Sequence, residues 1–506
     1  MVLASRGLTL TMGSESIMHE RYRLWVAERD WKPRTCVWEI TLACNLRCKH
    51  CGSRAGAPRR GELSTSECLG VVSQLEAAGC ELVTLSGGEP TLREDWDRIA
   101  QAIAARGMRI NMVSNGAYGS DADAGEVVRR ARAAGMANVG ISIDGPEQAH
   151  DELRGRGSFR RALSSVELFA RGGVDVAVMT TVSRHNLPLL ARVRQLAIDA
   201  GASMWRLQLA KPMGSMDDHR DLVLRPRQML ELVPLLACLK KKQGIELQVG
   251  DSIGHYGPHD GVLRGRGWRR RRESWQGCQA GMNAIGIEAD GGVKGCLSLQ
   301  AGADRGGGPD PFVEGNLRSS SLDQIWHRPG VFAFNREFCV DALTGACRSC
   351  GHGEICRGGP HCLSTAVNGL LTENPYCFHA LSVAADRRRS SGRAAAAAAA
   401  ALFLAVGPLS SCGSRSVAPD DTAVSEASPL AGDVGAKADL APPPWDLGAP
   451  AALDCTAIKC SPSPCWTCEY GVEPPLPPKD VWKACCCQNV CCECDYGLPP
   501  PAGCCP

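Results

Sequence analysis

The sequence predicts a mixed α/β fold in which a barrel-like domain precedes a small loop-rich domain and a tail of unusual composition. Between residues 35 and 242, short β-branched or apolar runs alternate with longer stretches of helical period, and glycines mark the joints. Such alternation is typical of parallel βα units. Cysteine and glycine then dominate from Cys278 to Cys377, before the composition changes again after residue 380. Six βα units are too few for a closed eight-fold barrel, so we expect a partial (β/α)6, TIM-like barrel.

The expected strands and helices follow one another along the chain. The strands are Thr35–Thr41, Glu81–Leu85, Met108–Val113, Asn138–Ile143, Val174–Val182 and Met204–Leu209. The helices between them are Thr65–Ala78, Asp95–Arg106, Ala122–Ala134, Phe159–Arg171 and Leu187–Ala200. A further helix near Arg225–Lys242 and a strand near Ile245–Val249 lead out of the barrel. In parallel α/β folds, functional residues lie at the C-terminal ends of the strands, and we expect a site there.

Changes of composition set the expected boundaries of the chain's parts. An N-terminal extension covers residues 1–34, the barrel 35–242 and a bridging segment 243–277. The cysteine-rich domain covers 278–380, a basic and then apolar segment 381–412, and a Cys/Pro-rich tail 413–506. Prolines and cysteines cannot build an ordinary hydrophobic core, so we expect the tail to be disordered.

Charge and cysteine content exclude several classes of protein. The 56 basic and 54 acidic side chains nearly cancel, which argues against a nucleic-acid partner, and no N-terminal signal peptide is evident. Of the 28 cysteines, 15 lie in residues 1–377 at metal-ligand spacings and 13 lie in residues 412–506 among prolines. A single disulfide framework does not fit this division, and the sequence predicts two different uses of cysteine in one chain.

Three cysteines directly after the first expected strand carry the clearest chemical signal. Cys44, Cys48 and Cys51 can wrap one face of a cubane iron–sulfur cluster and leave its fourth iron open for a ligand. The alternative is a zinc knuckle, but structural zinc takes four ligands, and the fourth would have to be His50 or a distant residue.

The ends of the next three strands carry glycines and polar side chains. Ser86 precedes a Gly87-Gly88-Glu89-Pro90 turn, in which the glycines allow the close approach of a ligand and Glu89 offers a carboxylate to an amino group. Further polar residues follow the third and fourth strands, and each is also an ordinary choice for a turn or cap. They are Ser114, Asn115, Ser142 and Asp144.

These cysteines, followed about forty residues later by Gly-Gly-Glu-Pro, resemble the radical S-adenosylmethionine (SAM) superfamily. The resemblance implies that the open iron of a [4Fe–4S] cluster chelates SAM, whose reductive cleavage gives a 5′-deoxyadenosyl radical. It also implies that Gly87, Gly88, Glu89 and Pro90 hold the methionyl amine and that His50 lies near the adenine. Ser142 and Asp144 would contact the ribose or the methionyl carboxylate. The segments that hold Ser114, Asn115 and Arg154 also match the family's pattern, and these three residues would complete the SAM site.

The second group of cysteines resembles the SPASM extension of peptide- and protein-modifying radical SAM enzymes. The resemblance implies two auxiliary clusters whose ligands interleave along the chain. Cys278, Cys296 and Cys362 would serve the first cluster, and Cys347, Cys350, Cys356 and Cys377 the second. The sequence departs from the SPASM pattern at Pro360, where a cysteine is usual, so one or two auxiliary [4Fe–4S] clusters are expected. His361 or Cys339 is a further candidate ligand of the first cluster. Structural zinc with free thiols is the alternative to the clusters.

The segment before the tail resembles a bacterial lipoprotein signal in an unusual position. Basic residues precede an apolar run, Ala394–Val406, and then Cys412. The run is shorter than the roughly twenty residues of a membrane-spanning helix. We consider three interpretations of the tail: a substrate fused to its own maturase, a fusion of two neighbouring reading frames, or an exported disulfide-rich module. Thiolate binding of zinc or copper by the tail would also fit its composition.

Together these patterns indicate a SAM-dependent radical oxidoreductase that modifies a ribosomally made peptide, with its own tail as one candidate. The partners implied are a peptide or protein substrate and a low-potential electron donor such as ferredoxin or flavodoxin. Exposed clusters imply a reducing cytoplasm for the catalytic part, with only the tail exported, lipid-anchored or in contact with a membrane. The alternatives are maturation of a separate protein, such as formylglycine formation in a sulfatase, and a redox or metal-binding protein without radical chemistry. No catalytic base can be chosen from the sequence.

Overall fold

The computed structural model describes residues 31–250, 252–265, 275–300, 310–369 and 371–405, and main-chain structure alone for 392–405. The chain divides into two units, Met1–Ser410 and Ser411–Pro506. The second unit lies outside the described residues, as do Cys412, the tail and nearly all of the N-terminal extension. The predictions made for those segments therefore remain predictions.

A single ten-stranded sheet organises the described part of the chain, in the order β10-β9-β8-β1-β2-β3-β4-β5-β6-β7. The strands of the barrel are β1 Thr35–Thr41, β2 Leu82–Gly87, β3 Arg109–Ser114, β4 Asn138–Ser142, β5 Asp175–Val182, β6 Met204–Leu209 and β7 Glu246–Val249. Neighbours among these seven strands pair in parallel. The predicted partial α/β barrel is confirmed, and β7, expected only as a strand leading out of the barrel, extends its sheet by one strand.

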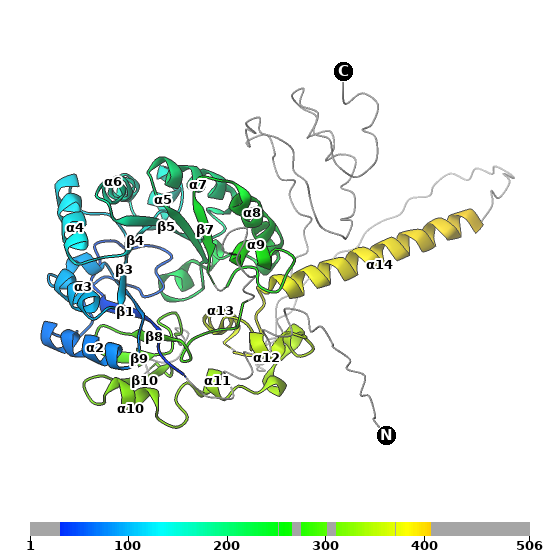
Figure 1. Ribbon diagram of the computed structural model, residues 1–506. Coiled ribbons are helices and arrows are strands. Elements are labelled where there is room, and N and C mark those ends of the chain that lie inside the picture. The colour runs from blue at the N-terminus through cyan, green and yellow to red at the C-terminus, as the bar shows by residue number, and fades with distance from the viewer. Residues whose placement is uncertain (1–30, 251, 266–274, 301–309, 370, 406–506) are drawn as a thin grey trace, which may run out of the picture. The chain divides into compact units, whose positions relative to one another are not determined.

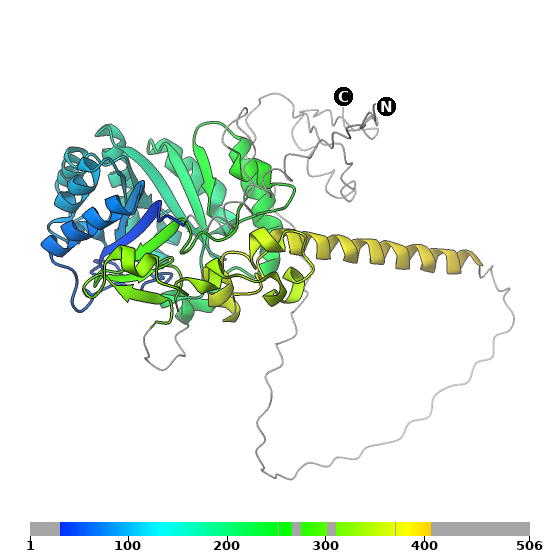
Figure 2. The ribbon, with the colours of Figure 1, turned by 60° about the horizontal axis from the view of Figure 1, so that its bottom comes forward.

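Helices cover one face of this curved sheet, which leaves the other face as the inside of the barrel (Figures 1 and 2). The helices are α2 Thr65–Ala77, α3 Trp96–Ala105, α4 Asp121–Ala133, α5 Glu147–Arg154, α6 Ser158–Arg171, α7 Leu190–Asp199 and α8 Met229–Lys241. Their apolar sides pack on alternate strand residues such as Trp38, Leu85 and Trp205, which are fully buried. Since strand side chains alternate between faces, the intervening residues point into the barrel.

The cysteine-rich domain continues the same sheet. Its first strand, β8 (Ala284–Ile287), pairs in parallel with β1, and β9 (Gly292–Lys294) and β10 (Val313–Asn316) follow as antiparallel strands. Beyond them the elements are short: α9 Asp260–Arg264 precedes the domain, and α10 Leu322–Trp326, α11 Ala333–Arg336, α12 Gly353–Cys356 and α13 His361–Asn368 lie within it. This loop-rich character agrees with the sequence prediction.

Ion pairs link this domain to the barrel. Arg318, after β10, reaches Glu67 on α2 with Nε 2.6 Å from the carboxylate. On the barrel's inner side, Arg59 donates to the buried Glu39 of β1 at 2.8 Å and lies 3.6 Å from Glu288. The domain is therefore held to β1 and α2 by ion pairs as well as by backbone pairing.

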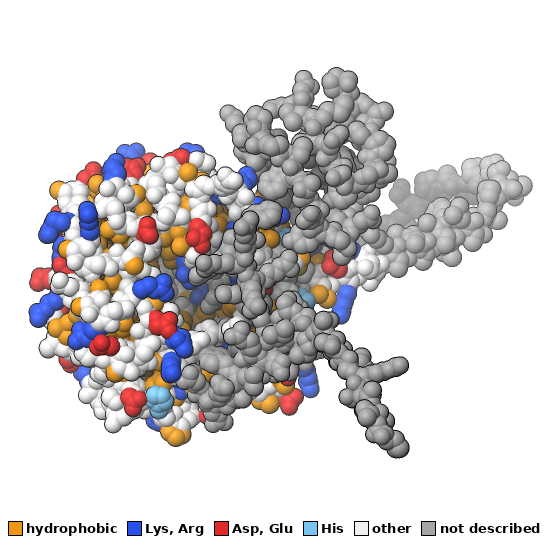
Figure 3. All heavy atoms as spheres, in the orientation of Figure 1, with side chains coloured by type: hydrophobic (Ala, Val, Ile, Leu, Met, Phe, Trp, Pro, Cys, Tyr) orange, Lys and Arg blue, Asp and Glu red, His pale blue; other side chains and the backbone are white. Residues whose placement is uncertain are grey.

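The last described element is a long helix, α14 (Phe378–Ala405), which includes most of the predicted apolar run. Among the described residues, none of the helices is long and apolar enough to cross a bilayer. On the face shown in Figure 3, basic and acidic side chains are interspersed over the described surface.

Candidate functional site

The loop after β1 carries Cys44, Cys48 and Cys51, and backbone N–H groups lie against the sulfurs of Cys44 and Cys51. The amide of Leu46 lies 3.5 Å from Cys44 Sγ, and the amide of Ala55 lies 3.4 Å from Cys51 Sγ. Cys44 Sγ also lies 3.8 Å from Asn115 Nδ2, at the end of β3. Donors aimed at sulfur stabilise thiolate, the form that binds iron.

Burial acts against the thiolate form in this loop. It raises the pKa of Cys48 to about 11, although the nearby Arg154 guanidinium opposes the rise, and it also raises the pKa of Cys44. Such thiols ionise readily only when a metal centre takes the thiolate. Among the described residues, no three His, Cys, Asp or Glu side chains are arranged to hold a single metal ion.

The two glycines of the Gly-Gly-Glu-Pro turn seat the cysteine loop on the end of β2. A Cβ on Gly87 would lie 2.0 Å from Thr41 O, and one on Gly88 would lie 2.1 Å from Ala43 O. The amides of Gly88 and Glu89 donate to the same two carbonyls, at 2.8 and 2.7 Å. The close approach that the sequence predicted is thus made to the protein's own backbone, which fixes the cysteine loop.

Glu89 is completely buried, and both of its carboxylate oxygens accept hydrogen bonds. Thr91 Oγ1 and Ser114 Oγ donate to one oxygen at 2.7 and 2.9 Å, and the Asn115 amide donates to the other at 2.8 Å. Burial raises its pKa, and these donors limit the rise. Glu89 therefore ties the ends of β2 and β3 together, and its proposed contact to an amine remains a prediction.

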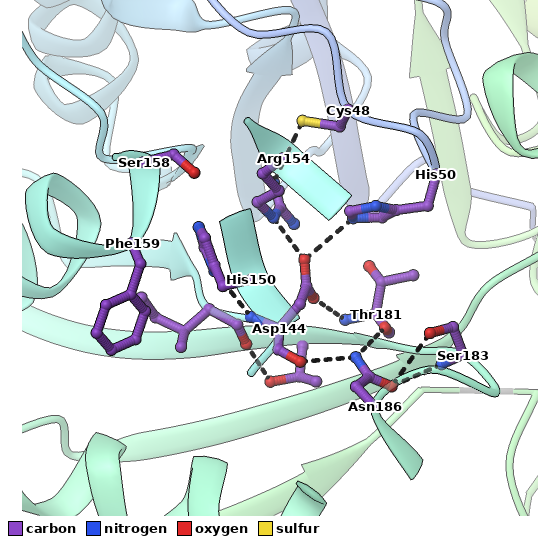
Figure 4. Close-up of polar contacts among 12 residues, drawn as sticks. Cys48, His50, Asp144, His150, Arg154, Ser158, Phe159, Thr181, Ser183 and Asn186 are labelled. Carbon is purple, nitrogen blue, oxygen red and sulfur yellow. Dashed lines mark hydrogen bonds and ion pairs between the residues drawn. The ribbon is translucent and has the colours of Figure 1, made fainter. Parts of the chain in front are cut away.

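A second buried carboxylate, Asp144 after β4, lies at the centre of the polar residues (Figure 4). Its Oδ2 is 3.1 Å from His50 Nε2 and 2.5 Å from Arg154 Nε, and its Oδ1 accepts from the Thr181 amide at 2.8 Å. Burial would raise the pKa of Asp144, but Arg154 and then His50 hold it well below its usual range. Arg154 Nη1 in turn lies 4.0 Å from Cys48 Sγ. The structure thus brings together four predicted residues, Cys48, His50, Asp144 and Arg154.

Two further residues hold the backbone of Asp144. Its amide donates to His150 Nδ1 at 3.2 Å, and its carbonyl accepts from Asn186 Nδ2 at 2.8 Å (Figure 4). Burial, together with the charge of Arg154, lowers the pKa of His150 to about 4, so the ring is neutral. Asn186 follows the end of β5, and Thr181 acts through its amide, which no residue type reveals.

The remaining predicted residues lie at the strand ends as expected. Ser114 and Ser142 close β3 and β4 and are buried, and Pro90 begins the short 3-10 turn η1 (Pro90–Leu92). Asn115 Nδ2 donates to Asn45 Oδ1 at 2.7 Å, which adds Asn45 of the cysteine loop to this network.

The second group of cysteines separates into the two predicted sets. Cys347, Cys350, Cys356 and Cys377 line one cavity of about 490 Å³, together with Tyr256 and the start of α14. Burial, and then the neighbouring Cys377, raises the pKa of Cys356 well above its usual value. Four converging thiols fit an iron–sulfur cluster in this cavity.

Cys278, Cys296 and Cys362 form the other set, packed with Ala280 and Leu299. Burial raises the pKa of Cys278, and Cys362 and Cys296 are the charges nearest to it. His361 is buried with Nε2 3.3 Å from Asn335 Oδ1, whereas Cys339 is exposed. The structure therefore brings three thiols together, and the exposed Cys339 is not one of them.

Comparison with known proteins agrees with this geometry. The family model described as the radical SAM superfamily matches residues 38–187, and the SPASM iron–sulfur cluster-binding domain matches residues 278–351. The mycofactocin maturase MftC of Mycobacterium ulcerans is 32% identical over 65% of this chain and 82% of its own length. The chain is a radical SAM enzyme with a SPASM domain.

Other relatives extend this finding. The AdoMet-dependent heme synthase of Methanosarcina barkeri is 28% identical over 69% of this chain and 97% of its own length. Among solved structures, Streptococcus suis SuiB bound to the precursor peptide SuiA is similar with a TM-score of 0.55. At 13% identity over 74% of this chain and 84% of SuiB, this likeness shows the fold alone.

Membership of this superfamily gives the enzyme its cofactors: a [4Fe–4S] cluster, SAM and auxiliary iron–sulfur clusters. When bound, they supply a 5′-deoxyadenosyl radical and electron transfer. The protein contributes a fixed cysteine loop, two buried carboxylates at neighbouring strand ends, and a cation, Arg154, held between Asp144 and Cys48.

Proposed function

We propose that this enzyme oxidatively modifies a ribosomally synthesised peptide, and that its own Cys-rich segment, residues 413–506, is the first peptide to test. The observation that carries the proposal is the similarity to mycofactocin maturase MftC across most of that protein's length. The fold shared with SuiB, a protein solved with its precursor peptide, supports it. The tail supplies 13 further cysteines if Cys412 is included, and in this proposal they are the targets of the radical chemistry.

In this proposal the described residues divide into three groups. Cys44, Cys48 and Cys51 bind the SAM-binding cluster. The strand-end residues bind SAM: His50, Gly87, Gly88, Glu89, Pro90, Ser114, Asn115, Ser142, Asp144 and Arg154. The two sets of SPASM cysteines bind auxiliary clusters, with Cys362 as the third ligand of the first. A low-potential ferredoxin or flavodoxin supplies electrons, and the catalytic part works in the cytoplasm.

The test is the intact mass of the tail after turnover. The full chain is reconstituted anaerobically with iron and sulfide, supplied with SAM and reductant, and then cut by protease to release the tail. Cys44→Ala/Cys48→Ala/Cys51→Ala is the control. A fixed mass change that the control lacks, together with 5′-deoxyadenosine, supports the proposal. An unchanged tail with normal 5′-deoxyadenosine means that the peptide substrate is a separate molecule. Persistent 5′-deoxyadenosine in the control would overturn the cluster assignment.

The heme synthase similarity favours a second candidate, oxidation of a tetrapyrrole. It covers nearly the whole of that relative, although at lower identity than MftC. Incubation of the same reconstituted enzyme with a carboxylated porphyrinoid separates the two candidates. A SAM-dependent mass loss in the pigment with an unchanged tail would favour the tetrapyrrole. Maturation of a separate protein, such as a sulfatase, is tested in the same way with a sulfatase peptide.

A further inference from the structure

One arginine of the barrel interior takes part in none of the contacts described above. In β6 the alternate residues Trp205, Leu207 and Leu209 are buried in the core beneath the helices. Arg206 and Gln208 lie between them and are exposed. Because side chains of a strand alternate, these two residues face away from the helices and into the barrel.

The strand register places Arg206 level with the predicted SAM site. Arg206 pairs with Met179 of β5, and Met179 pairs with Ser142 of β4. Paired residues of neighbouring parallel strands point to the same face, and adjacent strands lie about 4.8 Å apart. Arg206 therefore begins about 10 Å from Ser142, two strands along the same rung of the barrel.

The guanidinium of Arg206 has no hydrogen bond or ion pair with any residue that the structure describes. Two acids of the inner face have other partners: Glu246 accepts from Gln248 Nε2 at 3.0 Å, and Glu39 is paired with Arg59. Gln208 Nε2 is 3.3 Å from Thr181 Oγ1, beside the Asp144 network. The five N–H donors of Arg206 are thus available to a ligand in this part of the barrel.

We propose that Arg206 binds a carboxylate of the peptide substrate and so positions the peptide beside the radical site. This inference rests on the proposed function. A guanidinium binds a carboxylate through two parallel hydrogen bonds, a geometry that fixes orientation as well as position. The predicted SAM contacts come from the ends of β1 to β4, whereas Arg206 comes from the middle of β6, which favours the substrate over SAM as the source of the carboxylate.

Charge complementarity selects the tail as the peptide to test. Residues 413–506 contain 12 acidic and 5 basic side chains, whereas the whole chain is nearly neutral. Five acids lie among the tail's cysteines, at Glu469, Glu473, Asp480, Glu493 and Asp495. An arginine in the barrel is suited to such a segment.

The experiment compares full-length reconstituted wild type, Arg206→Gln and Arg206→Lys, with Arg129→Gln on the exposed side of α4 as the matched control. Loss of a charged hydrogen bond lowers occupancy by about ten- to a hundredfold, so Arg206→Gln should reduce the fraction of modified tail by that factor. Arg206→Lys should give an intermediate fraction of modified tail, because the positive charge is kept but the two parallel hydrogen bonds of the guanidinium are lost. SAM affinity, measured without reductant, should stay within about twofold, since loss of a peptide contact leaves the SAM site unchanged.

A second measurement needs no turnover. With SAM but no reductant, amide hydrogen exchange of residues 455–506 should be slower in wild type than in Arg206→Gln. Changing the five tail acids to amides should have the same effect, and combining this change with Arg206→Gln should add nothing further.

Each other result overturns the inference. Equal tail modification in wild type and Arg206→Gln removes Arg206 from substrate binding, and additive effects separate it from the tail acids. An equal loss of SAM affinity and of tail modification assigns the guanidinium to SAM. A wild-type tail that is neither modified nor protected, with normal 5′-deoxyadenosine, overturns the tail as substrate, and that failure is visible without any Arg206 variant.

Discussion

The barrel site and the SPASM domain use burial in opposite ways. In the barrel, the buried Asp144 is surrounded by partners that the protein itself supplies: Arg154, His50 and the Thr181 amide. In the SPASM domain, Cys356 and Cys377 are buried beside other thiols, and burial raises the pKa of Cys377 to about 11. The Asp144 network is electrostatically complete without cofactors, whereas the SPASM thiols become so only with iron.

The barrel and the SPASM domain also differ in the length of their secondary-structure elements. The barrel's helices and strands bury a continuous apolar core, whereas α11 and α12 have four residues each. Elements this short depend on tertiary contacts or a metal for their stability. Iron should therefore be a structural requirement of the SPASM domain and a chemical requirement of the barrel.

Removal of iron should have the largest effect of the changes that test this contrast. We expect a chelator, applied anaerobically under reducing conditions, to abolish hydrogen-exchange protection around Cys347–Cys377 while β1 to β6 stay protected. Cys350→Ala should mimic the chelator in that segment and lower the iron content. Cys339→Ala, at an exposed cysteine outside the cavity, should do neither. Full protection of the segment after chelation would show that protein packing alone holds it.

Breaking the Asp144 network should have the next largest effect. Asp144→Asn leaves the Arg154 charge buried without its partner, and such losses cost about 3–5 kcal/mol. Urea unfolding of the reconstituted protein measures the change. Asp218→Asn is the matched control, because Asp218 also pairs with an arginine of the cysteine loop, Arg54, but in solvent. A midpoint as little changed in Asp144→Asn as in the control would contradict the claim that this site is electrostatically complete.

The sequence predicted the parts of the site that depend on residue type and position in the chain. Cys44, the glycine turn and Asp144 each follow a strand, and parallel strands bring such ends together. Thr181 could not be predicted in this way, because its contribution is a backbone amide whose direction depends on β5.

Long-range pairing was also beyond the sequence. The register of β8 beside β1 joins residues about 250 positions apart, and no local pattern indicates it. The four-residue β7 was expected only as a strand beyond the barrel, because so short a run carries no signal of its neighbours. The division of the SPASM cysteines into two sets was implied by family resemblance. The structure brings the members of each set together, although no separate sequence motif marks either set.

His150 offers a smaller test, through pH. Its pKa is about 4 in the folded protein and about 6.5 when unfolded, so the unfolded state binds more protons between these values. Stability should therefore be unaffected above pH 6.5 and fall by up to about 3 kcal/mol as the pH drops toward 4. His150→Asn should flatten this dependence, which chemical denaturation at several pH values would show. An equally steep profile in the variant would assign the acid sensitivity to other groups.

The smallest effect should come from the junction between the two regions, at Glu67 and Arg318. Arg318 depresses the pKa of Glu67 to about 2, first through their hydrogen bond, so the pair stabilises the fold above the unfolded pKa of about 4.3 and is lost as pH falls toward 2. Both side chains are more than one-third exposed, which limits the cost of Glu67→Gln to about 0.5 kcal/mol. Arg318 also donates to the carbonyls of Gly61 and Glu62, so the junction should survive the substitution. Because α2 belongs to the barrel, the loss should be the same with and without iron, and should shrink in high salt. A loss seen only in the iron-loaded protein would mean that the SPASM clusters order this junction, and that the two regions are less independent than their burial patterns indicate.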